Sequence, residues 1–331
     1  MTANVELVPS RDIVVRAVDL TKQFPIKGGR SLRRSKRNVI HAVDNVTFSI
    51  ERGETLGLVG ESGSGKSTIG RLVAQLDTPT TGTVEVLEAD GADEVGRREG
   101  GARVQMVFQD PASSLDPRMR IRRSVGEPIA ATKRAERETL VAHAIQEVGL
   151  DAGIENRYPH ELSGGQAQRV CIARALIGEP ALVVLDEAVS ALDISTQVDI
   201  LARIADLQAR SNWSSLFISH DLKAVREISH RIAVMYFGQI VEMQTVTKGQ
   251  VEFLHPYSVA LRSAEPVLNE GVSKPPIFLN GELPSTVHVP TGCRFASRCP
   301  CATEKCRVEE PPPVVVGPSS WVACHYPGSL S

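Results

Sequence analysis

The sequence predicts an α/β fold built around a loop that binds phosphate. A short apolar strand at 56–59 leads into the glycine-rich stretch 60–68, and a helix is expected to follow at about 66–76. A continuous apolar strand at 181–185 is typical of a buried parallel sheet, and it ends in the two carboxylates of Asp186 and Glu187.

Composition narrows the possible functions. The chain has 331 residues, 42% of them hydrophobic, which allows one large core with a small appendage or two modest domains. A net charge of −2 and an aromatic content of 4% argue against a nucleic-acid partner. No apolar run reaches the roughly 18 residues of a membrane span, and the first residues lack a signal-peptide core. We therefore expect the chain to stay in the cytoplasm; if it works at a membrane, a partner must bring it there.

Periodicity and turn signals predict the other elements. Strand-like alternation covers 13–56, interrupted by a basic run at 27–37. We read this run as a solvated loop, with a role facing phosphate or lipid headgroups as the alternative. The further expected elements are strands at 103–108 and 214–219, helices at 133–149, 165–176, 194–209 and 221–228, and a hairpin at 231–243.

The composition changes at about residue 255, after which prolines become frequent. We place a domain boundary there, which gives a main domain at 1–255 and a C-terminal extension at 256–331. The extension is too small to support an apolar core of its own. It therefore needs a covalent or metal staple, or it must lie on the main domain.

The stretch 60–68 fits the phosphate-loop pattern G-x-x-x-x-G-K-[ST] in the required strand–loop–helix context. Backbone N–H groups and a helix N-terminus suit phosphate oxygens. Lys66 would reach the β- and γ-phosphates, and the Ser67 hydroxyl would ligate Mg²⁺. The residues expected to bind nucleotide here are Gly60, Glu61, Ser62, Gly63, Ser64, Gly65, Lys66, Ser67 and Thr68.

The acidic end of the 181–185 strand supplies the second part of the site. We expect Asp186 to hold Mg²⁺ and Glu187 to polarise the attacking water as a general base. An exposed acidic turn is the alternative, but the phosphate loop in the same chain favours the catalytic interpretation.

A third stretch lies between these two and consists of Leu162, Ser163, Gly164, Gly165 and Gln166. In this order and spacing it resembles the signature sequence of ABC transporter ATPases. The resemblance implies a P-loop NTPase fold with a RecA-like core, an antiparallel β subdomain and a helical signature subdomain. It also implies that the signature contacts ATP bound to the opposite subunit, again through N–H groups at a helix N-terminus.

The resemblance extends to further positions. Gln109 matches the glutamine that senses Mg²⁺ and water, and His220 matches the switch histidine that contacts the γ-phosphate. Phe24 lies where an aromatic ring stacks on adenine, with a core aromatic as the alternative. The residues that match the D-loop are Ser190, Ala191, Leu192 and Asp193.

The stretches at 107–118 and 159–163 and the tail resemble the oligopeptide/dipeptide permease ATPases. This implies an ATP-hydrolysing, energy-coupling subunit of a peptide importer, at the cytoplasmic face of the membrane. The implied partners are a second homologous ATPase, two transmembrane permease subunits and an extracytoplasmic solute-binding protein. Import of nickel, glutathione or another small solute is the first alternative, and a soluble non-transport ABC ATPase is the second.

Five of the six cysteines fall within 293–324, and their clustering favours metal ligation over disulfides in a reducing compartment. Their irregular spacing does not match a zinc ribbon. Tails of some resembling ATPases hold a [4Fe–4S] cluster, so we expect one here, with Cys301 as a neighbouring thiol; zinc and free thiols are the alternatives. The expected cluster ligands are Cys293, Cys299, Cys306 and Cys324.

Overall fold

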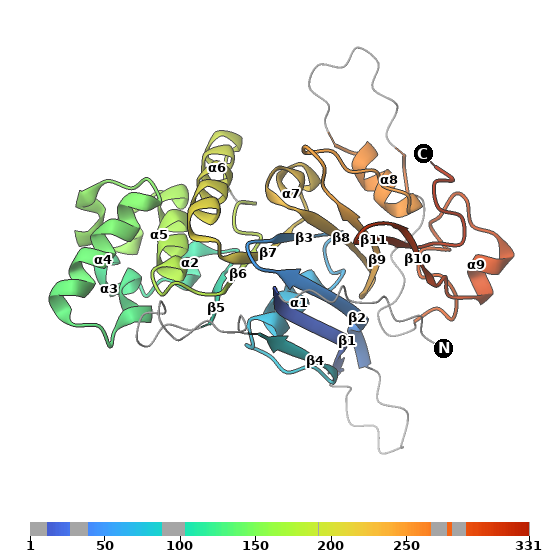
Figure 1. The fold of residues 1–331 in the computed structure, drawn as a ribbon, viewed down its shortest axis with the longest axis horizontal. Helices are drawn as coiled ribbons and strands as arrows, with labels where there is room; N and C mark the ends of the chain where they lie inside the picture. The colour runs from blue at the N-terminus through green and yellow to red at the C-terminus, as the bar shows by residue number, and fades with distance from the viewer. Residues whose placement is uncertain are drawn as a thin grey trace, which may run out of the picture.

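The structure is a computed structural model, and it describes residues 12–26, 39–87, 103–190, 192–265, 277–279 and 289–330. The basic run at 27–37 lies outside the described residues. Two sheets occupy the middle of the molecule, a group of helices forms one end, and the C-terminal elements form the other end (Figure 1).

The larger sheet has eight strands in the order β10-β11-β9-β8-β3-β7-β6-β5. The strands from β8 to β5 pair in parallel, whereas β9, β11 and β10 extend the sheet with antiparallel pairs. The parallel strands are β3 (Thr55–Val59), β5 (Val104–Val107), β6 (Leu182–Asp186), β7 (Ser214–Ser219) and β8 (Arg231–Tyr236). The antiparallel ones are β9 (Gln239–Thr245), β10 (Pro313–Gly317) and β11 (Ser320–Ala323).

The smaller sheet is antiparallel, in the order β2-β1-β4, with β1 at Ile13–Pro25, β2 at Val39–Glu51 and β4 at Thr81–Val86. Its buried side chains share one apolar cluster with strands β3, β6 and β7 and with helix α1 (Lys66–Val73). This cluster fixes α1, and therefore the loop before it, between the two sheets.

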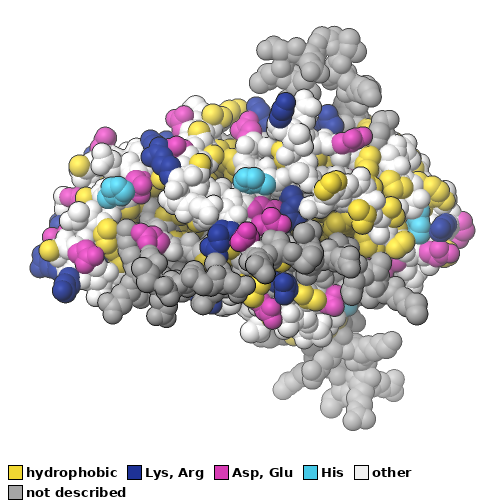
Figure 2. All heavy atoms as spheres, viewed as in Figure 1, with side chains coloured by type: hydrophobic (Ala, Val, Ile, Leu, Met, Phe, Trp, Pro, Cys, Tyr) yellow, Lys and Arg dark blue, Asp and Glu magenta, His cyan; other side chains and the backbone are white. Residues whose placement is uncertain are grey.

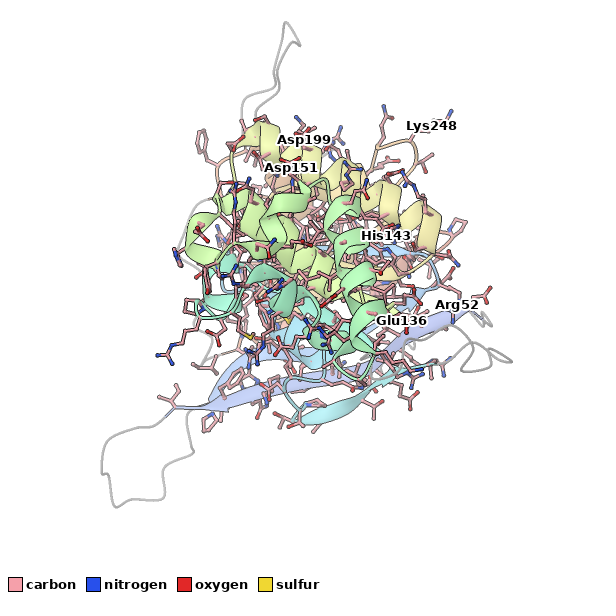
Figure 3. All side chains as sticks on the ribbon, turned by 90° about the vertical axis from the view of Figure 1, so that its left-hand side faces the viewer. Arg52, Glu136, His143, Asp151, Asp199 and Lys248 are labelled. Atoms are coloured by element: carbon pink, nitrogen blue, oxygen red, sulfur yellow. The ribbon has the colours of Figure 1, made fainter. Side chains whose placement is uncertain are left out.

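A group of helices forms the end of the molecule away from the chain's C-terminus (Figure 1), and Figure 3 views this end directly. Glu136 and His143 of α4 are labelled there, and both belong to its solvent-facing, charged surface. The helices here are α2 (Pro111–Ser114), α3 (Ile121–Val125), α4 (Arg134–Glu147) and α5 (Gly164–Leu176), with short 3₁₀ turns at Glu127–Ile129, Ala152–Asn156 and Pro159–Glu161.

The remaining helices are α6 (Ile194–Ser211), α7 (Leu222–Ile228), α8 (Pro256–Ser263) and α9 (Glu304–Val308). The described tail lies on the main domain, because β11 pairs with β9 and Phe295 is buried in the principal core. Within the described ranges, no helix is long and apolar enough to cross a membrane.

The α/β fold and the antiparallel sheet predicted from the sequence are confirmed. The expected strand at 181–185 is displaced by one residue in the structure, and the helix expected at 66–76 ends at Val73. Strand β4 replaces part of the turn that the sequence suggested near 77–82.

Candidate active site

The stretch 60–68 runs from the end of β3 into the first turn of α1, as the motif requires, and its loop portion is 60–65. Gly65 has a φ of 106°, and a Cβ there would lie 2.1 Å from the carbonyl oxygen of Ala42. Because of this close approach, only glycine fits. Ser62 and Gly63 are exposed at the rim, so the backbone of the loop can be reached from solvent.

Lys66 lies beneath this loop and is only 4% exposed. Its Nζ donates to the carbonyl oxygens of Gly60 at 2.8 Å and Glu61 at 2.9 Å. Burial lowers the pKa of Lys66, while the nearby carboxylates of Glu187, Asp186 and Glu61 act in the opposite direction. An ammonium has three donors, so the lysine keeps one for a phosphate oxygen.

Ser67 and Asp186 meet although they are far apart in sequence. The Ser67 hydroxyl donates to Asp186 Oδ1 at 3.0 Å. Burial raises the pKa of Asp186, and the adjacent Glu187 raises it further. A hydroxyl and a carboxylate that converge in a partly buried site match the ligands that Mg²⁺ prefers beside nucleotide phosphates.

Glu187 lies between two polar side chains that follow other strands. Gln109, just after β5, donates from Nε2 to Glu187 Oε2 at 3.0 Å. His220, just after β7, places its Nδ1 3.5 Å from Glu187 Oε1. Because β5, β6 and β7 are parallel neighbours, their carboxyl ends bring the three residues to one edge of the sheet.

The signature residues lie at the N-terminus of α5. Ser163 is the N-cap, and its hydroxyl accepts from the Gln166 N–H at 3.3 Å, while the Gln166 side chain accepts from the Ser163 N–H at 3.1 Å. These residues line an open cavity of about 400 Å³. In the described part of the chain, no hydrogen bond or ion pair joins the signature to the P-loop.

The D-loop residues lie between the turn at Glu187 and the cavity that the signature lines. The Ser190 hydroxyl donates to the carbonyl oxygen of Glu187 at 3.0 Å, and Asp193 caps α6 by accepting from the Thr196 N–H at 3.0 Å. Leu192 lines the same cavity as the signature. Ala191 lies outside the described residues.

Phe24 lies on β1 and is 38% exposed. The ammonium of Lys22 stands 5.2 Å from the centre of its ring. Much of the ring is therefore open to solvent rather than packed as a core aromatic.

The cysteines converge on one small cavity of the tail. Its lining includes Cys293, Cys299, Cys301, Cys306 and Cys324. Burial raises the pKa of Cys293, Cys299 and Cys324 to about 11. The cavity has a volume of about 10 Å³, and the described residues include no group of three His, Cys, Asp or Glu that could hold one metal ion. The expected cluster and the zinc alternative thus lack support in this geometry.

Sequence reasoning missed the contacts that the tail makes with the P-loop. Tyr257 accepts from the Glu61 N–H at 2.8 Å, and Arg298 pairs with the Glu61 carboxylate. A local sequence pattern cannot predict the contact between Glu61 and Arg298, because the two residues are 237 positions apart in the sequence.

Among the described residues on the face shown in Figure 2, charged side chains of both signs are intermixed with hydrophobic ones. The site combines a phosphate loop, an acid beside the serine of that loop, and a carboxylate that lies between an amide and an imidazole. Together these groups define a nucleotide-hydrolysing enzyme.

Comparison with known proteins agrees with this site. Residues 43–190 match the ABC transporter family, and residues 241–306 match the oligopeptide/dipeptide transporter C-terminal region. The chain is 43% identical to the probable peptide ABC transporter ATP-binding protein y4tS of Sinorhizobium fredii, over 95% of this chain and 90% of that protein. It is also 43% identical to the oligopeptide transport ATP-binding protein AppF of Bacillus subtilis, over 96% of this chain and 98% of that protein.

A solved structure shares the cassette. The ATP-binding cassette MJ0796, a dimer bound to ADP and phosphate in a post-hydrolysis state, is 27% identical with a TM-score of 0.58. The match covers 70% of this chain and 99% of the MJ0796 chain. The chain belongs to the ABC transporter ATP-binding proteins, in the oligopeptide/dipeptide permease family. It is an ATPase of the ABC type.

Proposed function

We propose that this chain is the energy-coupling ATPase subunit of an importer for oligopeptides or dipeptides. The observation that carries the ATPase part is the meeting of Ser67 and Asp186 at 3.0 Å, with Glu187 beside them. The names of the relatives and the match to the peptide-transporter C-terminal region support peptides as the cargo.

The residues divide the work of hydrolysis among them. The N–H groups of the P-loop and Lys66 hold the β- and γ-phosphates, while Ser67, Asp186 and Gln109 would hold Mg²⁺, which offsets charge on the phosphates. Glu187 accepts a proton from the attacking water. His220, beside Glu187, would contact the γ-phosphate, and the exposed part of the Phe24 ring would stack on adenine.

The signature completes a site on a second subunit. Its helix N-terminus lines an open cavity beside Leu192 and Asp193, and among the described residues no hydrogen bond or ion pair joins it to the P-loop of its own chain. Two ATPase subunits placed head to tail would therefore sandwich ATP between the P-loop of one and residues 162–166 of the other. The dimeric cassette bound to ADP and phosphate supports the pairing of two ATPase subunits.

The partners follow from this role. A second homologous ATPase, two transmembrane permease subunits and an extracytoplasmic solute-binding protein complete the importer, with this chain peripheral at the cytoplasmic face of the membrane. We place the nucleotide-binding domain at 1–255 and the permease-type extension at 256–331. The match of residues 241–306 to a separate family region supports a division near this point.

The cargo is tested by reconstituting the chain with its permease partners and solute-binding protein in proteoliposomes. Di- and oligopeptides should stimulate ATP hydrolysis several-fold over the basal rate. Glutathione and Ni²⁺ serve as matched solutes and should leave the rate unchanged. Stimulation by either of those alone would replace peptide import with the import of that solute. ATPase activity that needs no membrane partner and responds to no solute would favour a soluble, non-transport ATPase.

We further propose that Cys293, Cys299, Cys306 and Cys324 bind a [4Fe–4S] cluster in the cell. Five thiols line one cavity, and thiols are the ligands that such a cluster takes, which supports the proposal although the described geometry forms no metal site. The cavity of about 10 Å³ must widen to admit the cluster. Anaerobic purification with iron and sulfide analysis should give about four of each per chain. Colourless protein with stoichiometric zinc, or with no metal, would overturn this proposal.

A further inference from the structure

The loop at 293–301 carries three of the tail cysteines and is called the cysteine loop below; it contacts the P-loop directly. Arg298, immediately before Cys299, donates from Nη1 to Glu61 Oε2 at 2.8 Å and from Nη2 to Glu61 Oε1 at 3.1 Å. Two parallel charge-assisted bonds fix direction as well as distance. Glu61 is the second residue of the P-loop, so this pair joins the extension to the nucleotide site.

The pair lies in a shielded place. The Arg298 side chain is 10% exposed and the Glu61 side chain 26%. The guanidinium stands 6.0 Å from the centre of the Tyr236 ring, and Tyr236 packs against Tyr257 and Phe295. Because the pair is largely removed from solvent, it is screened less than a surface ion pair.

The backbone of Glu61 is held on two further sides. Its N–H donates to the Tyr257 hydroxyl at 2.8 Å, and its carbonyl oxygen accepts from Lys66 Nζ at 2.9 Å. Glu61, which pairs with Arg298, therefore also accepts a hydrogen bond from Lys66, the lysine expected to bind phosphate. A shift of Glu61 would displace Lys66 and the N–H groups that follow it.

A second arginine of the same loop is connected to the P-loop indirectly, through Phe237 and Gly238. Arg294 donates from Nη1 to the carbonyl oxygen of Phe237 at 2.6 Å and pairs with Asp44. The next residue, Gly238, donates its N–H to the carbonyl oxygen of Ser64 at 2.9 Å. The P-loop is thus connected to the cysteine loop at both Glu61 and Ser64.

We propose that Arg298 is a positioning residue for ATP binding, which acts through Glu61 and makes the cysteine loop and the P-loop one coupled unit. This inference rests on the proposed ATPase function. A P-loop held in its binding geometry loses less conformational freedom when ATP enters. By linkage, nucleotide binding stabilises the cysteine loop to the same extent that the loop strengthens nucleotide binding.

The test measures the dissociation constant for ATP of the full chain by titration calorimetry. Arg298→Gln should weaken binding about tenfold, since it removes a paired, charge-assisted contact. Arg298→Lys should recover part of the loss, because an ammonium keeps the charge but not the bidentate geometry. The matched control is Arg307→Gln in the same tail, where the side chain is 60% exposed and 3.9 Å from Glu304; it should bind ATP as the wild type does.

Three further measurements separate positioning from structural damage. In the assembled transporter, Arg298→Gln should raise KM for ATP with kcat nearly unchanged. Glu61→Gln should weaken binding to the same extent, and the double variant should be no weaker than the single ones. Equal ATP affinity of wild type and Arg298→Gln, or losses that multiply in the double variant, would overturn the inference. A wild-type chain that binds no ATP would instead overturn the proposed function.

Discussion

Glu187 adopts a left-handed backbone conformation, with a φ of 49°, that non-glycine residues seldom take. Its N–H donates to the carbonyl oxygen of Ile218 at 2.9 Å, which ties this turn to β7. The turn directs the carboxylate towards Gln109 and His220 rather than along β6. The backbone thereby separates the roles of two adjacent acids, with Asp186 beside Ser67 and Glu187 beside the switch histidine.

Replacing Glu187 with glutamine keeps the shape of the side chain and removes its ability to accept a proton. We expect Glu187→Gln to bind ATP with unchanged affinity and to hydrolyse it at least about 100-fold more slowly, as loss of a general base implies. Nucleotide-bound dimer should accumulate in size-exclusion chromatography with the partner subunit. Normal turnover by this variant would show that Glu187 is not the base.

Cys171 illustrates a thiol whose role is packing. It is 2% exposed within α5, and burial raises its pKa to about 11. Since a thiol reacts as its thiolate, iodoacetamide at pH 8 should label Cys171 at least about tenfold more slowly in the folded chain than in urea. Mass spectrometry of the labelled peptide provides the measurement. Equal rates in both states would contradict the buried position.

At the scale of elements, the signature both caps helix α5 and lines the open cavity expected to face the partner subunit. The reciprocal bonds of Ser163 and Gln166 form a capping box, which satisfies two N–H groups at this end of α5. The N–H groups of the first turn are the ones that suit an anion. Gly165 packs closely on Thr196 of α6, where a Cβ would lie 2.7 Å from the threonine methyl. The cap and the close packing explain the serine and the second glycine of the signature in structural terms.

We expect Ser163→Arg to abolish hydrolysis at the partner's P-loop while ATP binding by the isolated variant persists. The large cation blocks the approach of the other subunit but lies outside this chain's own P-loop. Ser163→Ala is the comparison variant, because it removes the capping hydroxyl without adding bulk or charge, and it should cost about 1 kcal/mol of stability. Calorimetry and ATPase assays of the mixed dimer provide the two measurements. Loss of ATP binding by the isolated Ser163→Arg chain would argue against a shared site.

At the scale of the whole molecule, the cassette could be predicted from local patterns, because its central strands are rich in apolar residues and its site residues follow them directly. Strand β4 was missed because its sequence, Thr-Gly-Thr at the start, resembles a turn. The β10–β11 hairpin was missed because the prolines around it indicated loop, although β11 completes a sheet edge by pairing with β9. The link between Arg298 and Glu61 depends on the way the tail folds back, which periodicity does not encode.

The central claim is that the P-loop of this chain binds and hydrolyses ATP to drive transport. The most direct test is the ATPase rate of the reconstituted transporter with Lys66→Ala, against Lys305→Ala, a tail lysine that is 53% exposed, as the control. Lys66→Ala should reduce the contribution of this chain's site to less than about a tenth, because the charge that clamps the phosphates is lost. Its thermal unfolding should stay close to that of the wild type, and Lys305→Ala should leave the rate unchanged. A folded Lys66→Ala subunit that retains full hydrolysis and peptide uptake would contradict the claim.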